Sequence, residues 1–360
     1  MIFAGEHGIL NEKQFVKNAK GDKHMKKIRY GVIGASGMAQ SHMNAIVWNN
    51  EAELKAVCDT NAERTAQCVA KYGVDGYSDY REMLARSDID AVVICTPDQL
   101  HKEMSVAALD AGKHVLCEKP MALTLEECKA MVKAANASDR KFMVGQICRY
   151  TPGFVGAKKM IDAGEIGELF FVETEYAHDY SHISGLGGWR LDPLRHGFLG
   201  GGCHAVDLAS WIAGKPTEAM AYSNKKMLKD WPTDDCTIAI LKYPNDVIGK
   251  VFVSTGCKRN YTMRSCFYGS KGTIITDNTS NHMQVFKTEA DCGFTTPMLY
   301  PISINNHNTV GEIGDFNDRI INDKPIETTA IEGASTVAAA LACVRSSKTG
   351  LPEKISYDFD

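Results

Sequence analysis

The sequence lacks a surplus of either charge, a long apolar run, and any pair of cysteines at short spacing. Its 40 Lys and Arg residues stand against 44 Asp and Glu, so the formal net charge is -4. Binding to phosphate backbones needs a basic surface, and we therefore expect no nucleic-acid partner. No apolar stretch reaches the roughly 18–20 residues of a membrane span, so we expect no membrane partner either.

The scattered cysteines argue against a metal site and against a disulfide framework. Several of the 12 lie in apolar runs, such as Cys95 in AVVICTP and Cys117 in HVLCEKP. This is typical of buried free thiols in a reducing compartment, and zinc would need ligands at short spacing. Residues 1–27 carry Glu6, Glu12 and Asp22 without a sustained apolar stretch. That pattern is not typical of a signal peptide, and by elimination we expect a cytoplasmic protein.

The chain, with 360 residues of which 44% are hydrophobic, is long enough for two domains. Residues 1–25 form an N-terminal extension, either a disordered leader or an arm that packs on a neighbouring subunit. Residues 26–147 alternate short apolar runs with helical stretches, which predicts an α/β fold with a Rossmann, doubly wound parallel sheet. Residues 148–360 predict an α+β substrate domain with a large, mostly antiparallel open sheet.

The individual elements follow from the apolar runs between turn signals. In the first part we expect strands over Ile28–Ile33, Leu54–Cys58, Ala91–Cys95, His114–Cys117 and Phe142–Gln146, and helices over Gly37–Trp48, Asn61–Tyr72 and Thr124–Asn136. The T-x-x-E spacing of Thr124 and Glu127 predicts a capping box at the last of these helices. In the second part we expect strands over Leu169–Tyr176, Thr237–Tyr243, Ile248–Ser254 and Thr273–Asp277, and a helix from about Ile331 to Ser346.

A glycine turn joins the first predicted strand to the first predicted helix. In IRYGVIGASGMA, the G-x-G-x-x-G/A pattern falls on Gly34, Ser36 and Ala39, so a serine replaces the middle glycine. Backbone amides at the helix start, near Gly37 and Met38, can hold a pyrophosphate. The second strand ends in AVCDT, where the Asp59 carboxylate can accept from the ribose hydroxyls and repel a 2′-phosphate, which favours NAD over NADP.

Later motifs identify a family. Thr96, Pro97 and His101 form a TP-x-x-x-H segment, the EKP triplet Glu118–Pro120 follows the expected strand His114–Cys117, and PGFVGAKKMIDAGEIGEL and GGGCHAVDLASW come farther on. In this order they resemble the Gfo/Idh/MocA family, named for glucose–fructose oxidoreductase and inositol dehydrogenase. The resemblance implies that the TP and EKP segments line the cofactor site, with Glu118 near the nicotinamide ribose. It also implies pairing through the open second sheet into homodimers or homotetramers.

The resemblance also implies two groups for proton transfer. Lys119 should emerge beside the nicotinamide and act as acid/base, if burial and the cationic ring lower its pKa. The family pattern D-x-x-x-H aligns with His204, but the position of the aspartate is Gly200. Asp192 is a candidate replacement for that carboxylate. Asp207 is the other candidate, although we expect its role to be structural, inside a helix. His204 would then act as the acid/base or only hydrogen-bond the substrate.

The segment 176–196 is too irregular for a regular element and too polar for a core, so we expect a loop over the active site. The candidate substrate contacts are polar or aromatic residues in or near it: Arg149, Tyr150, Tyr180, His182, Trp189, Arg190, Asp192 and His196. Asn308 is a further candidate at the pocket rim.

We expect an NAD-dependent oxidoreductase that oxidises a secondary hydroxyl of a sugar, cyclitol or glycoside to a ketone. Two alternatives stay open. One is an NAD-dependent glycoside hydrolase that uses transient oxidation with tightly bound NAD. The other is a non-catalytic NAD-binding regulator, which the missing aspartate favours and the intact Lys119 opposes.

Overall fold

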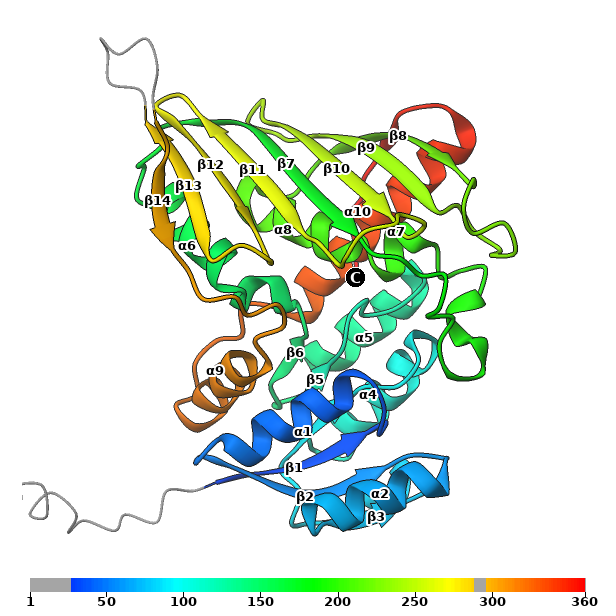
Figure 1. Cartoon of the computed structure of the whole chain (residues 1–360). Helices are drawn as coiled ribbons and strands as arrows, with labels where there is room; N and C mark the ends of the chain where they lie inside the picture. Colours follow the sequence, from blue (N-terminus) through cyan, green and yellow to red (C-terminus); the bar gives the residue numbers. More distant parts are fainter. Residues whose placement is uncertain (1–26, 288–295, 360) are drawn as a thin grey trace, which may run out of the picture.

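The computed structural model describes residues 27–287 and 296–359, and Figure 1 shows their arrangement. The N-terminal extension predicted for residues 1–25 lies outside the described residues. The first sheet has six parallel strands in the order β3-β2-β1-β4-β5-β6. Its strands are β1 (Ile28–Ile33), β2 (Ala52–Cys58), β3 (Asp75–Tyr77), β4 (Ala91–Ile94), β5 (His114–Cys117) and β6 (Phe142–Val144). The parallel Rossmann sheet expected from the sequence is confirmed.

Helices connect these strands and cover the sheet. They are α1 (Met38–Trp48), α2 (Ala62–Tyr72), α3 (Tyr80–Leu84), α4 (His101–Asp110) and α5 (Leu125–Ala137). The predicted capping box at α5 is confirmed, because Thr124 accepts from the Glu127 amide and Glu127 accepts from the Thr124 amide. Strands β4 and β5 have almost wholly buried side chains, as expected of strands covered on both faces.

The second sheet has nine strands in the order β14-β13-β12-β11-β7-β10-β9-β8-β15. They are β7 (Leu169–Ala177), β8 (Glu218–Asn224), β9 (Cys236–Lys242), β10 (Ile248–Ser254), β11 (Arg264–Gly269), β12 (Gly272–Asp277), β13 (His282–Lys287), β14 (Met298–Pro301) and β15 (Glu353–Lys354). All neighbours are antiparallel except β7 and β10, which are parallel. The expectation of a mostly antiparallel sheet is confirmed.

One face of the second sheet packs against helices that lie between it and the first sheet (Figure 1). These helices are α6 (Pro152–Asp162), α8 (Cys203–Ala213) and α10 (Ala330–Thr349), with the short α7 (Gly197–Gly200) beside them. The helix α9 (Thr309–Ile321) follows β14 in the chain and packs on α1 of the first sheet's helices. The helix α10 also packs on α5. The two sheets are therefore joined by helices from the last part of the chain.

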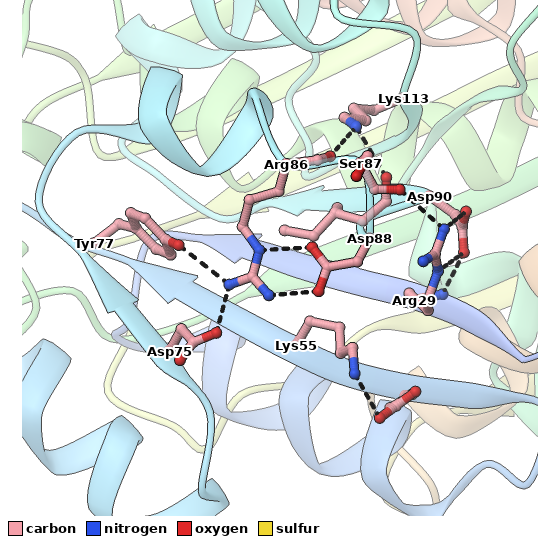
Figure 2. Close-up of polar contacts among 11 residues, drawn as sticks. Arg29, Lys55, Asp75, Tyr77, Arg86, Ser87, Asp88, Asp90 and Lys113 are labelled. Carbon is pink, nitrogen blue, oxygen red and sulfur yellow. Dashed lines mark hydrogen bonds and ion pairs between the residues drawn. The ribbon is translucent and has the colours of Figure 1, made fainter.

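A polar network fixes the edge of the first sheet where its strands begin, opposite the glycine turn (Figure 2). Arg29 binds both carboxylate oxygens of Asp90 through Nε and Nη2 at 2.8 and 2.7 Å. Arg86 makes a similar fork to Asp88, and the buried Lys113 ammonium donates to the Arg86 carbonyl at 2.6 Å. This network stabilises the end of the sheet that holds no functional residue predicted from the sequence.

Candidate active site

A single cleft of roughly 670 Å³ collects every residue predicted to bind the cofactor. Its lining includes Gly34, Ser36, Gly37, Met38, Asp59, Thr96, Pro97, His101, Glu118 and Lys119. These residues follow the carboxyl ends of β1, β2, β4 and β5, which parallel strands bring to one edge of the sheet. Residues 182–185, Trp189, Arg190 and Arg195 line the same cleft, so the loop expected over the active site lies there.

The glycine turn has the backbone geometry of a phosphate cradle. Gly34 has a φ of 93°, and a Cβ built on it would lie 2.6 Å from the Cys95 carbonyl oxygen, so only glycine fits. Gly37 precedes α1 with a φ of 53°, and nothing lies within 4 Å of the place of its Cβ. No side chain caps α1 at Gly37, so the helix N-terminus has room to accept a pyrophosphate.

Asp59 stands at the end of β2 with its carboxylate anchored. One oxygen accepts from the Ala35 amide at 2.9 Å, and the other accepts from the Asn61 amide at 2.8 Å. Arg64 binds both oxygens, at 2.7 and 3.2 Å. Although burial opposes ionisation, these hydrogen bonds lower the pKa of Asp59. The carboxylate is charged and fixed where the adenosine ribose of a dinucleotide would lie.

Lys119 follows β5 within a group of buried charges. Glu118 is held by His42 of α1, whose Nε2 lies 2.8 Å from a Glu118 oxygen. Burial opposes the charge on Lys119, but neighbours that include Cys203 and Glu118 together raise the pKa of the lysine. From the sequence we expected burial to lower the pKa of Lys119. In the protein without NAD, the neighbouring groups outweigh that effect.

His204 lies in α8 among aromatic rings and not beside a carboxylate. Its ring stacks with those of Tyr176 and His307, each at 5.9 Å between centroids. Its Nδ1 lies 3.5 Å from the Cys148 sulfur. Burial, with the charge of Lys119 and with His307 as lesser causes, lowers the pKa of His204 well below its ordinary value, so the ring is neutral.

Neither acid proposed as a replacement partner contacts His204. Asp192 accepts from Gln99 at 2.9 Å and from the Leu194 amide at 2.8 Å. Asp207 is committed to a buried ion pair, in which Arg149 donates to it at 2.7 and 3.1 Å. Neither carboxylate therefore takes the place of the missing aspartate, which corrects the suggestion for Asp192, whereas the ion pair of Asp207 agrees with the structural role expected of it.

The structure separates the predicted substrate contacts into two groups. His182, Trp189 and Arg190 line the cleft. The others are not among the lining residues and have defined partners elsewhere. Arg149 pairs with Asp207, Tyr150 donates to Asp315 at 2.7 Å, the Tyr180 hydroxyl shares a hydrogen bond with that of Tyr176, Asp192 accepts from Gln99, His196 caps α7 by accepting from the Phe198 amide, and Asn308 caps α9 by accepting from the Gly311 amide. His101 also has a structural role, since its ring nitrogens contact the carbonyls of Pro120 and Thr96 at 2.9 and 3.1 Å.

Around His204 lies a cluster of rings, of which only Tyr180 was predicted from the sequence as a site residue. Tyr176 and Tyr180 share a hydrogen bond of 2.8 Å, and the Tyr261 hydroxyl lies 3.2 Å from Nε2 of His307. His178 packs on Tyr261 with 4.9 Å between ring centroids. His307 could have been predicted together with its neighbour Asn308, because both lie in the NNHNTV segment. Among the described residues, no group of three or more His, Cys, Asp or Glu could hold a metal ion, and no helix is long and apolar enough to cross a membrane.

The fold and the cleft define a two-domain protein that binds a dinucleotide at the edge of a Rossmann sheet. Residues 28–146 match the family described as "Oxidoreductase family, NAD-binding Rossmann fold", and residues 154–275 match the "GFO/IDH/MocA C-terminal domain". The chain belongs to this family of NAD-dependent oxidoreductases, as the sequence motifs indicated.

Similar proteins in this family include two dehydrogenases. An inositol 2-dehydrogenase of Rhizobium meliloti is 29% identical over 332 residues, which cover 89% of this chain and 96% of that protein. A levoglucosan dehydrogenase of Pseudarthrobacter phenanthrenivorans is 28% identical over 292 residues, 70% of this chain and 74% of that protein. A solved structure of levoglucosan dehydrogenase in complex with NADH superposes with a TM-score of 0.85 at 26% identity, covering 92% of this chain and 99% of that one.

Proposed function

We propose that this protein oxidises a secondary hydroxyl group of a sugar, cyclitol or glycoside to a ketone, with NAD as acceptor. The observation that carries the proposal is the position of Lys119. It lies two residues after the end of β5 and lines the same cleft as the phosphate cradle and Asp59. Relatives named for inositol and levoglucosan support a polyhydroxylated substrate.

The reaction removes a proton from the hydroxyl oxygen and a hydride from its carbon. When bound, NAD⁺ supplies the hydride acceptor and a positive charge beside Lys119, which lowers the pKa of that amine. Lys119 Nζ then takes the hydroxyl proton as general base. His204 is neutral, so it assists by hydrogen bonding to the substrate and not by carrying charge.

A substrate panel tests the reaction. The protein is mixed with NAD⁺ and a set of inositols, monosaccharides and glycosides, and the absorbance of NADH is followed. The proposal predicts NADH formation with at least one of these compounds. Release of aglycone from a glycoside without net NADH would instead indicate the hydrolase, and NAD binding without either product would indicate the regulator.

The assignment of the base is tested by Lys119→Met on the substrate that the panel identifies. Removing a general base costs about 10²–10⁴-fold in turnover, and we expect a loss in that range with NAD still bound. Lys102→Met is the matched control, because Lys102 lies on α4 and outside the cofactor cleft. Full turnover by Lys119→Met would refute this role.

We also propose that a second copy of the chain covers the open face of the nine-stranded sheet. Large apolar side chains are exposed on that sheet and include Phe170, Tyr222, Ile238, Ile240 and Ile248. On β9 these alternate with buried residues that face the helices. Several large apolar side chains exposed on one face of a sheet are typical of a protein interface, and an isologous pair would bury them on both copies.

A further inference from the structure

The space of the missing aspartate is filled by an arginine. A Cβ built on Gly200 would lie 2.4 Å from Nη1 and 2.5 Å from Cζ of Arg195. Real Cβ atoms essentially never approach other atoms closer than 3.0 Å. No side chain fits at position 200 while the guanidinium of Arg195 stays where it is. The glycine at this position and the arginine five residues earlier therefore depend on each other.

Arg195 is held in place by a buried ion pair with the cofactor side of the cleft. Its Nε donates to Asp98 Oδ2 at 2.6 Å, and each side chain is only 4% exposed. Asp98 begins the short helical turn Asp98–Leu100 that follows Thr96 and Pro97. The guanidinium also lies over the Trp189 ring, with Cζ 4.7 Å from its centroid. One side chain thus connects the covering loop, the TP segment and the turn before α8.

A second contact binds the same loop to the same turn. Gln99 donates through its amide nitrogen to the Trp189 carbonyl at 3.0 Å and to Asp192 at 2.9 Å. The covering loop is therefore attached to the first domain at Trp189, which itself lines the cleft, and again at Asp192 and Arg195. These contacts hold the loop closed over the cofactor site.

A buried ion pair is a weak way to gain stability, because desolvation offsets most of the attraction. Arg195 also keeps Nη1 buried without a hydrogen-bond partner among the described residues, and such an atom carries a further cost. Two apolar side chains would fill this space at lower cost. The pair thus points to a role in the site that it borders.

We propose that Arg195 is a positioning residue for the oxidation: with Asp98 it replaces the carboxylate four residues before His204 and sets the covering loop and the His204 turn relative to Lys119. This inference rests on the proposed function. It implies that His204 works without an acidic partner, so that Lys119 alone carries the proton. The groups that face His204 are Lys119, His307, Tyr176 and Cys148.

The first test removes both charges and keeps a neutral pair. In Asp98→Asn/Arg195→Gln we expect kcat to fall about 100-fold, the size that a small misplacement of catalytic groups produces, while the affinity for NAD changes by less than about threefold. The matched control is Arg29→Gln/Asp90→Asn, which neutralises an ion pair at the opposite edge of the sheet. It should lower the thermal midpoint and leave kcat unchanged. Wild-type kcat and KM in Asp98→Asn/Arg195→Gln would overturn the proposal.

The second test restores the family carboxylate. Gly200→Asp alone forces the guanidinium of Arg195 to move and should lower turnover, whereas Asp98→Asn/Arg195→Gly/Gly200→Asp has room for the new side chain. We expect this exchange variant to exceed Gly200→Asp in turnover by about tenfold or more, as the Asp–His pair forms. Equal turnover of the two variants would contradict the shared-space argument.

A readout without turnover separates this inference from the proposed function. The His204 ring is titrated by NMR in the exchange variant and in Asp98→Asn/Arg195→Gly, with a His204→Asn spectrum for assignment. An adjacent carboxylate should raise the pKa of His204 by about 1–3 units. An unchanged titration overturns the inference, even if the wild-type protein oxidises a sugar. A wild-type protein that oxidises nothing in the panel refutes the proposed function and leaves this titration valid.

Discussion

The preference for NAD over NADP provides a quantitative test of the site, and Asp59→Ala is the change to make. The carboxylate is ionised and fixed by the Ala35 amide and Arg64. Two unit charges about 4 Å apart near a protein surface interact by about 4 kcal/mol. Arg64 offsets part of the repulsion between Asp59 and the 2′-phosphate of NADP. We take the net repulsion as about 2 kcal/mol, so that removing it should raise the affinity for NADP about 30-fold.

The same change weakens NAD. A hydrogen bond from the ribose to a charged acceptor contributes about 1.5 kcal/mol or more, so NAD affinity should fall about tenfold. Arg64 loses its partner in Asp59→Ala and becomes available to bind a 2′-phosphate. Both effects act in the same direction, and together they shift the ratio of the two dissociation constants by roughly 300-fold.

The assay is a calorimetric or fluorescence titration with NAD⁺ and with NADP⁺, and it needs no substrate. Asp59→Asn is the matched control, because its amide oxygen can still accept from the Ala35 amide while the charge is gone. This variant isolates the repulsion and should shift the ratio by about 30-fold. If both variants keep the wild-type ratio, the Asp59 argument is refuted.

Three further predictions test the cradle, a buried acid and the open sheet. Gly34→Ala places a methyl group 2.6 Å from the Cys95 carbonyl oxygen, so the affinity for NAD should fall more than about tenfold. The control is Gly112→Ala, which has a similar positive φ but open space around it and should change the affinity for NAD little in the same titration. Burial raises the pKa of Glu312 to about 8 from 4.5, so the folded state holds a proton that the unfolded state releases, and the thermal midpoint should fall as pH rises from 4.5 to 8. Glu312→Gln should remove most of that decline, and an equal decline in the variant would contradict it. Ile240→Asp should give a smaller assembly by size-exclusion chromatography, whereas Leu351→Asp, exposed elsewhere, should not.

The first half of the fold could be predicted closely because its signals are local. The strands Ile28–Ile33 and His114–Cys117 were predicted at their observed bounds, and the capping box of Thr124 fixed the start of α5. A buried parallel strand is a short apolar run, and its helix starts at a recognisable cap. The three-residue strand Asp75–Tyr77 escaped because it has no apolar run, with two exposed residues and one half-buried residue.

The second sheet was predicted as a class but not strand by strand. The strand Ile248–Ser254 was predicted at its observed bounds, whereas β8, β11, β13 and β14 were missed. The parallel pairing of β7 with β10 was not expected either. A strand in such a sheet is stabilised by neighbours far along the chain, so its own residues carry a weaker signal.

The residues predicted to bind the cofactor could be brought together from the amino-acid sequence. Gly34, Asp59 and Lys119 each follow a buried strand, and parallel strands bring their carboxyl ends to one edge. The order of strands and helices along the chain was sufficient to predict that these residues lie together, because the same local unit of strand, turn and helix recurs.

The surroundings of His204 depend on the tertiary fold and could not be predicted from the sequence. It showed Arg149 in an ion pair with Asp207, brought His307 against His204, and placed Arg195 in the space beside Gly200. These groups come from elements that no local pattern relates to one another. Their contacts depend on how helices from the last part of the chain join the two sheets, and a histidine or arginine in a loop carries no sign of which distant residue it will meet.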